Sequence, residues 1–133
     1  MFIDATLKIA DAQGITVSGA STSYIDTLRT NLSAKNDVTM VITIITAVTA
    51  SGGATVDFAL QDDTSDAFGG AATVVSTGAV AKASLTAGAV LKLKVPHKSI
   101  DRYMRAYITI ATGPLLTGAW DIDFVVDADQ KIV

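Results

Sequence analysis

Apolar and polar residues alternate over four separate segments of this 133-residue chain. Successive side chains of a β-strand point to opposite faces of the sheet, so this alternation is typical of strands with one buried face. The four segments are 55–61, 90–95, 102–110 and 120–127. In the third segment, Tyr103, Arg105 and Tyr107 share one face, opposite a face of apolar residues. The pattern predicts an all-β fold.

Weaker strand patterns fill much of the remaining sequence. They cover residues 2–9, 15–20, 24–28 and 73–77, and the longer apolar run 38–48 is typical of a central strand with both faces buried. Turn-forming groups such as Ser51-Gly52-Gly53 and Gly113-Pro114 separate the segments. About eight short strands at this spacing predict a single domain over residues 1–133, an antiparallel β-sandwich of jelly-roll type. A short helix is expected only in the Ala-rich stretch 79–89.

The chain is more apolar than most soluble monomers. Hydrophobic residues make up 50% of it and charged residues 17%, against a usual charged fraction of about 25%. The longest apolar run is too short for a membrane-spanning helix, which needs about 20 residues. The N-terminus also lacks the basic and apolar regions of a secretory signal peptide. We therefore expect no membrane insertion, and an outer surface that is partly buried against other proteins.

Charge and cysteine content exclude further classes of function. The net charge is −3 and no dense basic cluster is present, which argues against a nucleic-acid partner. The chain has no cysteine, so disulfides, zinc thiolate sites and thiol catalysis are excluded. This composition suits folding in a reducing cytoplasm.

Two groups of residues have the types, but not the arrangement, of a catalytic site. His97, Ser99 and Asp101 are the types of a nucleophilic triad, but a spacing of two sets them in a parallel row. Triad members instead converge from separate segments. Asp121 and Asp123 would lie about 7 Å apart along a strand, a separation that some glycosidases use. They are expected on a solvated outer face without a cleft, so we expect neither an enzyme nor a cofactor.

Other charged groups are expected to have structural roles. Asp62, Asp63 and Asp66 crowd the end of the 55–61 strand, where an acidic turn is expected and calcium binding is left open. An acidic stripe is expected to pair with basic residues of neighbouring strands, unless one set faces a partner of opposite charge. The acidic set is Asp121, Asp123, Asp127 and Asp129, and the basic set is Lys92, Lys94, Arg102 and Arg105.

Two features are candidates for contact with a partner. Leu115 and Leu116 lie between turn-forming pairs, and an exposed apolar loop tip is an interaction candidate unless it folds back onto the core. Tyr103 and Tyr107 share a face and are able to form an aromatic platform, as in carbohydrate-binding modules, whereas Trp120 is expected in the core. A ligand-binding β-sandwich is therefore the alternative function.

Seven short motifs follow one another in a characteristic order along nearly the whole chain. They are MFIDA at 1–5, DAQ at 11–13, STSYID at 21–26, VSTGA at 75–79, RYMR at 102–105, ATGP at 111–114 and VDA at 126–128. In this order they resemble the capsid cement proteins of short-tailed bacteriophages, in particular the family of the Bordetella phage cement protein.

The resemblance implies a jelly-roll-like fold, self-association into a homodimer and no enzymatic activity. It also implies a place on the outer surface of the virion capsid, bound to the major capsid protein, after synthesis in the bacterial host cytoplasm. We expect Leu115, Leu116, Tyr103, Arg105 and Tyr107 among the contacts with the capsid or with a second copy. The sequence leaves open which capsid protein is bound, whether the oligomer is a dimer or a trimer, and which face meets the shell.

Overall fold

The computed structural model describes residues 8–26, 32–33, 38–95 and 99–126. Its strands are β1 (Lys8–Gln13), β2 (Gly19–Ala20), β3 (Ile25–Asp26), β4 (Leu32–Ser33), β5 (Val38–Thr49), β6 (Thr55–Asp63), β7 (Ala72–Ser76), β8 (Val80–Ala81), β9 (Val90–Lys94), β10 (Ser99–Ile100), β11 (Tyr103–Ala111) and β12 (Thr117–Val126). A single-turn 3₁₀ helix, Lys82–Ser84, lies in the stretch where a short helix was expected. The predicted all-β class is confirmed.

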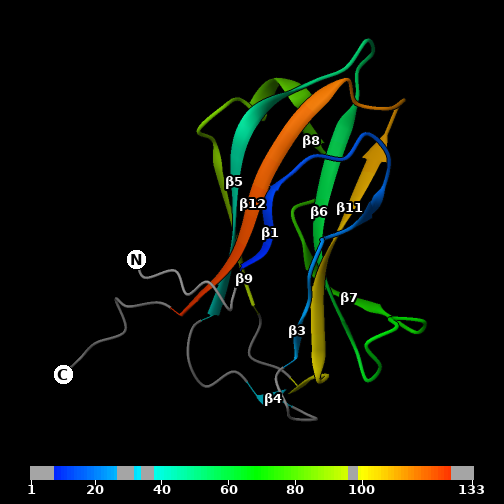
Figure 1. Cartoon of the computed structure of the whole chain (residues 1–133), viewed down its shortest axis with the longest axis vertical. Helices are drawn as coiled ribbons and strands as arrows, with labels where there is room; N and C mark the ends of the chain where they lie inside the picture. Colours follow the sequence, from blue (N-terminus) through cyan, green and yellow to red (C-terminus); the bar gives the residue numbers. More distant parts are fainter. Residues whose placement is uncertain (1–7, 27–31, 34–37, 96–98, 127–133) are drawn as a thin grey trace, which may run out of the picture.

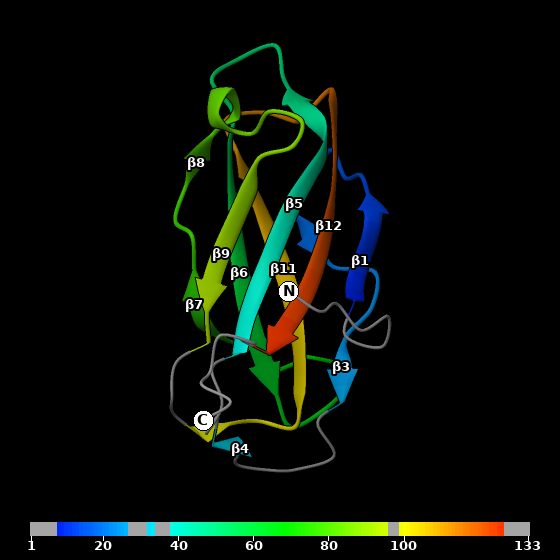
Figure 2. The ribbon, with the colours of Figure 1, turned by 90° about the vertical axis from the view of Figure 1, so that its left-hand side faces the viewer.

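Two antiparallel sheets pack face to face (Figures 1 and 2). One sheet has the strand order β1-β12-β5-β9, and the other has the order β2-β11-β6-β7, with β3 also beside β11 and β8 beside β6. Numbered in chain order, with β2 and β3 merged, β7 and β8 merged, and the small β4–β10 ribbon set aside, these orders are 1-8-3-6 and 2-7-4-5. This interleaving of the two ends of the chain is the jelly-roll arrangement.

The core consists of the apolar side chains that the period-2 pattern assigns to one face of each strand. Trp120, Phe58 and Phe124 are the largest of these buried side chains. Trp120 from one sheet and Phe58 from the other meet edge to face, with ring centroids 5.1 Å apart and planes at 89°. This contact joins the two sheets at their centre, and it confirms the core position expected for Trp120.

Strands β6 and β11 form the longest regular pair of the second sheet. Their register runs without a shift from Tyr103 opposite Asp63 to Ala111 opposite Thr55. Ala106 and Ile108 point into the core and are fully buried. The opposite face of β11 therefore presents its alternate side chains on the outside of the sandwich, as the pattern predicts.

The structure differs from the predicted strands in the chain's first third and in one face of β5. In the predicted strand 15–20, only Gly19 and Ala20 pair, because residues 14–18 form a loop that crosses to the other sheet. The strand 38–48 is not buried on both faces throughout, since Ile45 is 45% exposed although Val41 is buried. Residues 2–7 and 27–28 of the predicted strands lie outside the described residues.

Candidate interaction surface

Five side chains from three separate segments meet on the outer face of the β6–β11 pair. Tyr103, Arg105 and Tyr107 come from β11, Tyr24 precedes β3, and Phe68 follows β6. We call this set, Tyr24, Phe68, Tyr103, Arg105 and Tyr107, the aromatic–arginine patch. Tyr24 is 46% exposed, whereas Phe68 is buried and the three β11 side chains are half-buried.

Arg105 lies at the centre of the aromatic–arginine patch. Its guanidinium carbon is 4.5 Å from the ring centroid of Phe68 and 5.5 Å from that of Tyr107. Its Nε–H donates a hydrogen bond to Oε1 of Gln61, which lies directly opposite on β6, over 2.9 Å. Cation–π contact with two rings and one directed hydrogen bond together hold the guanidinium plane in one orientation.

The rings of the aromatic–arginine patch do not form the flat platform that the sequence suggested. Tyr24 meets Phe68 at 68° and Tyr103 at 74°, so both contacts are edge to face. The guanidinium group of Arg105 lies over the rings of Phe68 and Tyr107. That of Arg102 lies over the ring of Tyr103, with its guanidinium carbon 5.0 Å from the ring centroid. A sugar stacks on open ring faces, so this arrangement does not favour a carbohydrate-binding module.

Arg102, at the margin of the patch, is held by a carboxylate. Its Nε and Nη2 donate to the two carboxylate oxygens of Asp26 over 2.7 and 2.9 Å. The hydrogen bond to Asp26 raises the pKa of Arg102, although burial acts in the opposite direction. The carboxylate partner that the structure gives Arg102 is therefore on β3, beside β11, and was not in the predicted acidic set.

Asp63, the last residue of β6, caps the turn that carries Phe68. The Asp63 carboxylate accepts hydrogen bonds from the backbone N–H of Ser65 (3.2 Å) and Gly70 (2.8 Å). Burial raises the pKa of Asp63, but these N–H donors outweigh it and hold the pKa below its ordinary value. Asp62 accepts from the backbone N–H of Asp101 over 2.9 Å. The acidic turn thus positions Phe68 under Arg105.

The structure gives the positions of most of the residues considered for a metal site and for a catalytic triad. Among the described residues, no group of three or more His, Asp or Glu side chains is arranged to hold a metal ion. Ser99 lies in β10, paired with Ser33 of β4. Asp101 is joined to Asp62 through its backbone, and His97 lies outside the described residues. No helix in the described part of the chain has the length and hydropathy that crossing a membrane requires.

The acidic stripe of β12 pairs with a lysine that the sequence did not suggest. Lys8 Nζ lies 3.4 Å from Asp121, 3.9 Å from Asp123 and 3.7 Å from Asp11. The predicted partners Lys92 and Lys94 are on β9, separated from β12 by β5, and Arg105 is on the other sheet. Asp127 and Asp129 lie outside the described residues.

Asp123 is not on a solvated face, which corrects the prediction from its alternation with apolar residues. It is 2% exposed, because β1 pairs with β12 and brings Lys8 directly opposite it. Burial raises the pKa of Asp123 despite the opposing effect of Lys8. Burial lowers the pKa of Lys8, but the neighbouring carboxylates outweigh it and raise that pKa overall.

Replacing Lys8 with methionine is expected to lower the free energy of unfolding at pH 7 by about 1–2 kcal/mol, because Asp123 loses its nearest cation. The raised pKa means that folded Asp123 takes up a proton at a pH where the unfolded chain is still ionised, so the loss should shrink as the pH falls. Urea unfolding at pH 7 and at about pH 4 measures both effects. The same change at exposed Lys92 is the control, and an equal loss at both pH values would contradict the assignment.

The predicted loop-tip leucines have different environments. Leu115 is 2% exposed and belongs to the core, whereas Leu116 is 64% exposed. The backbone N–H of Leu115 donates to Thr16 and that of Leu116 donates to Thr49, so the loop is held against two neighbouring segments. Leu115 is therefore corrected to a core residue, and only Leu116 remains a candidate contact.

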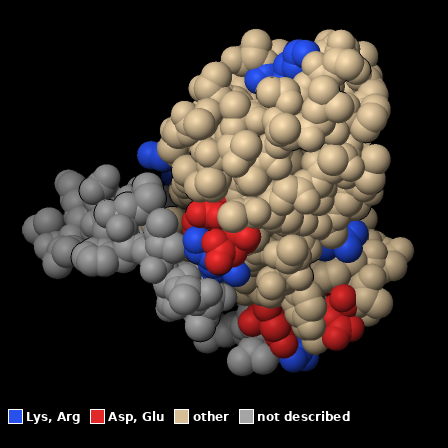
Figure 3. All heavy atoms as spheres, turned by 45° about the horizontal axis from the view of Figure 1, so that its top comes forward, with Lys and Arg blue, Asp and Glu red and all other residues tan. Residues whose placement is uncertain are grey.

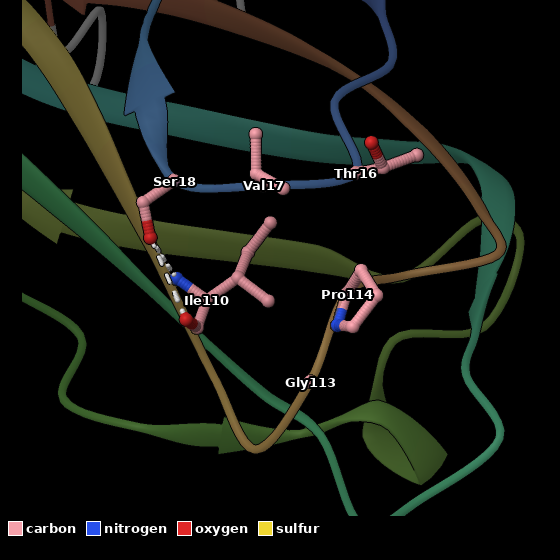
Figure 4. A pocket seen from close by; sticks show the side chains of 6 residues that line it. All are labelled: Thr16, Val17, Ser18, Ile110, Gly113 and Pro114. Carbon is pink, nitrogen blue, oxygen red and sulfur yellow. Dashed lines mark hydrogen bonds between the residues drawn. The ribbon is translucent and has the colours of Figure 1, made fainter.

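An open pocket of about 350 Å³ lies at this end of the sandwich (Figure 4). Its lining is Thr16, Val17, Ser18, Ile110, Gly113 and Pro114. Ser18 Oγ accepts a hydrogen bond from the backbone N–H of Ile110 over 2.8 Å, which closes one side of the pocket. Val17 is 64% exposed. The pocket offers apolar contact area, and none of its six lining residues carries a charge.

Charge is unevenly distributed over the molecule. The loops at residues 14–18, 50–54 and 111–117 contain no charged side chain. In Figure 3, the surface over this end is mostly uncharged apart from a small basic group at the top, and the acidic atoms on the visible face gather farther down. Lys82, whose Nζ donates to the carbonyl oxygen of Ala50, contributes a positive charge beside these loops. Uncharged small residues with two exposed aliphatic side chains, Val17 and Leu116, give a second surface suited to contact with protein.

Sequence reasoning found only part of the aromatic–arginine patch. It identified Tyr103, Arg105 and Tyr107 from their shared strand face, but not Tyr24 and Phe68, which come from loops. No local pattern marks a loop residue as the neighbour of a distant strand. The turn signal Phe68-Gly69-Gly70 predicted a loop and carried no indication of its partner.

A comparison with protein-family models adds an independent finding. The model of the family Bbp16 matches residues 9–124, which is most of the chain and includes all of the aromatic–arginine patch. The comparison with curated proteins gave no match. Because the family model covers well over half of the chain, the protein belongs to the Bbp16 family, which derives from a Bordetella phage.

Proposed function

We propose that this protein is a phage capsid cement protein, which binds the outer face of the icosahedral shell and stabilises it across the seams between subunits. The observation that carries the proposal is a preformed aromatic–arginine patch on a sandwich of a phage-derived family. Tyrosine and arginine are the residue types that contribute most to protein–protein affinity. The major capsid protein is the proposed partner.

The physical role of such a protein is to favour the assembled shell by mass action. A domain that binds the shell but not the free subunits stabilises the assembly by its own binding free energy. A specific contact buries about 800 Å² per partner, and the accessible surface of 6977 Å² has room for two such contacts. The aromatic–arginine patch and the uncharged end with Val17 and Leu116 are the surfaces we propose for them.

Self-association strengthens this effect. A homodimer that touches two subunits gains affinity from the effective concentration of its second site, without any new contact. The low charged fraction, 17%, suits a molecule with several covered surfaces. The proposed role is therefore structural and not catalytic.

Purified protein is expected to co-sediment with expanded, undecorated capsids at micromolar concentration and to raise the temperature at which packaged DNA is released. Capsids that already carry the protein are the control, because their sites are filled and they should take up no more. Wild-type protein that stays in the supernatant at micromolar concentration would reject the proposed function.

A further inference from the structure

We propose that Arg105 is a carboxylate-binding site and that its occupant is an aspartate or glutamate side chain on the surface of the shell protein. The inference rests on the proposed function for the identity of the partner. It adds the chemistry of recognition, which neither the family nor the fold provides.

Arg105 has donors that no described residue uses. A guanidinium group carries five N–H donors, and Arg105 commits one of them, Nε–H, to Gln61. Among the described residues, no carboxylate forms an ion pair with it. Arg102, which immediately precedes β11, instead binds both carboxylate oxygens of Asp26. Within the described part of the chain, Asp26 therefore satisfies Arg102, whereas the Nη donors of Arg105 are open to a ligand.

The surroundings of Arg105 make this an organised site. Phe68 and Tyr107 hold the guanidinium plane, and Gln61 fixes its rotation, so little side-chain entropy remains to be lost on binding. The aromatic groups also exclude water from its sides, which strengthens a charge-assisted hydrogen bond. A planar carboxylate suits the open edge of the fork, because two parallel N–H···O bonds can form there.

The charge balance favours a protein carboxylate over the phosphates of a nucleic acid. A phosphate backbone is bound by rows of basic side chains, whereas the patch offers one open arginine on a chain of net charge −3. Asp66, close by, acts on Tyr24, whose pKa it raises. A single carboxylate can reach Arg105 past this charge, but a polyanion would also be repelled by Asp66 and by the net negative charge of the chain.

Arg105→Gln is expected to weaken binding to undecorated capsids about 30-fold, and Arg105→Lys by about as much, since lysine keeps the charge but loses the planar fork. Lys92→Gln is the matched control: it removes the same charge from the outer face of the other sheet and should bind like wild type. Asp66→Asn should bind as tightly as wild type or more tightly. Unchanged melting temperatures establish that each variant is folded.

A second arm tests the ligand itself. Amidation of the capsid's surface carboxylates with carbodiimide and glycinamide should abolish binding of the wild-type protein. The affinity of the Arg105→Gln variant should be the same for amidated and untreated capsids. If wild-type protein binds capsids and Arg105→Gln binds equally well, the inference is overturned and the proposed function stands.

Acetate provides a readout that does not depend on capsids. Titration of the isolated protein with acetate should shift the NMR signal of the Arg105 Nε–H saturably, whereas acetamide should not, and Arg102 should respond less because Asp26 occupies it. Should wild-type protein fail to bind capsids, the proposed function falls and this titration still decides the site. A flat acetate titration would then overturn the carboxylate assignment as well.

Discussion

Trp120→Ala is expected to lower the free energy of unfolding by about 3–5 kcal/mol, the range for removing a large aromatic side chain from a core. Trp120 is fully buried, and it packs edge to face on Phe58 of the opposite sheet. The change removes the apolar contact that joins the two sheets and leaves a cavity at their centre. Because single domains of this size are marginally stable, such a loss is a large part of the total.

Urea unfolding followed by far-ultraviolet circular dichroism measures this loss, since tryptophan fluorescence disappears with the side chain. Trp120→Phe is the matched control and should lose less than half as much. Phenylalanine keeps the ring contact and removes an indole Nε1–H that has no hydrogen-bond partner among the described residues. A loss below about 1 kcal/mol for the alanine variant would show that this contact does not hold the sheets together.

Leu115→Ala is expected to lower the free energy of unfolding by about 2–5 kcal/mol, whereas Leu116→Ala should change it by less than about 0.5 kcal/mol. The two residues are adjacent and identical, so composition and local propensity cancel in the comparison. The difference arises from burial alone: Leu115 is 2% exposed and Leu116 is 64% exposed.

The same two variants separate core from contact surface. Under the proposed function, Leu116→Ala should reduce co-sedimentation with undecorated capsids while its melting temperature stays that of the wild type. Equal stability losses for the two variants would mean that the loop does not turn Leu115 inward. Full capsid binding by Leu116→Ala would remove the uncharged end from the proposed contacts.

The regular parts of the fold were predictable because period 2 is a local property. Segments 55–61 and 102–110 became β6 and β11 with the predicted inner and outer faces, within a residue or two of the predicted bounds. The expected strand at residues 15–20 was largely wrong, because its apolar residues lie in a loop between the sheets. Alternation over so few residues does not distinguish a strand from a crossing segment.

The environment of the charged residues could not be predicted from local sequence patterns. Asp123 alternates with apolar neighbours and was predicted to be solvated, but β1, from the other end of the chain, covers it with Lys8. Cross-strand pairing occurs as predicted, but the partner of Asp121 and Asp123 is Lys8, which was not among the predicted basic residues. Which strand is adjacent to β12 depends on the order of strands in the sheet, and a single sequence does not contain that order explicitly.

By itself, the sequence determined that this chain forms a jelly-roll-type sandwich and that Tyr103, Arg105 and Tyr107 face away from its core, because strand geometry links sequence position to side-chain direction. Only the tertiary structure decided that Tyr24 and Phe68 join them, that Asp26 satisfies Arg102 while Arg105 keeps open donors, and that Leu115 turns inward. The physical reason is that these contacts join residues far apart in the chain. Their partners are set by how the sheets pack, and not by local spacing.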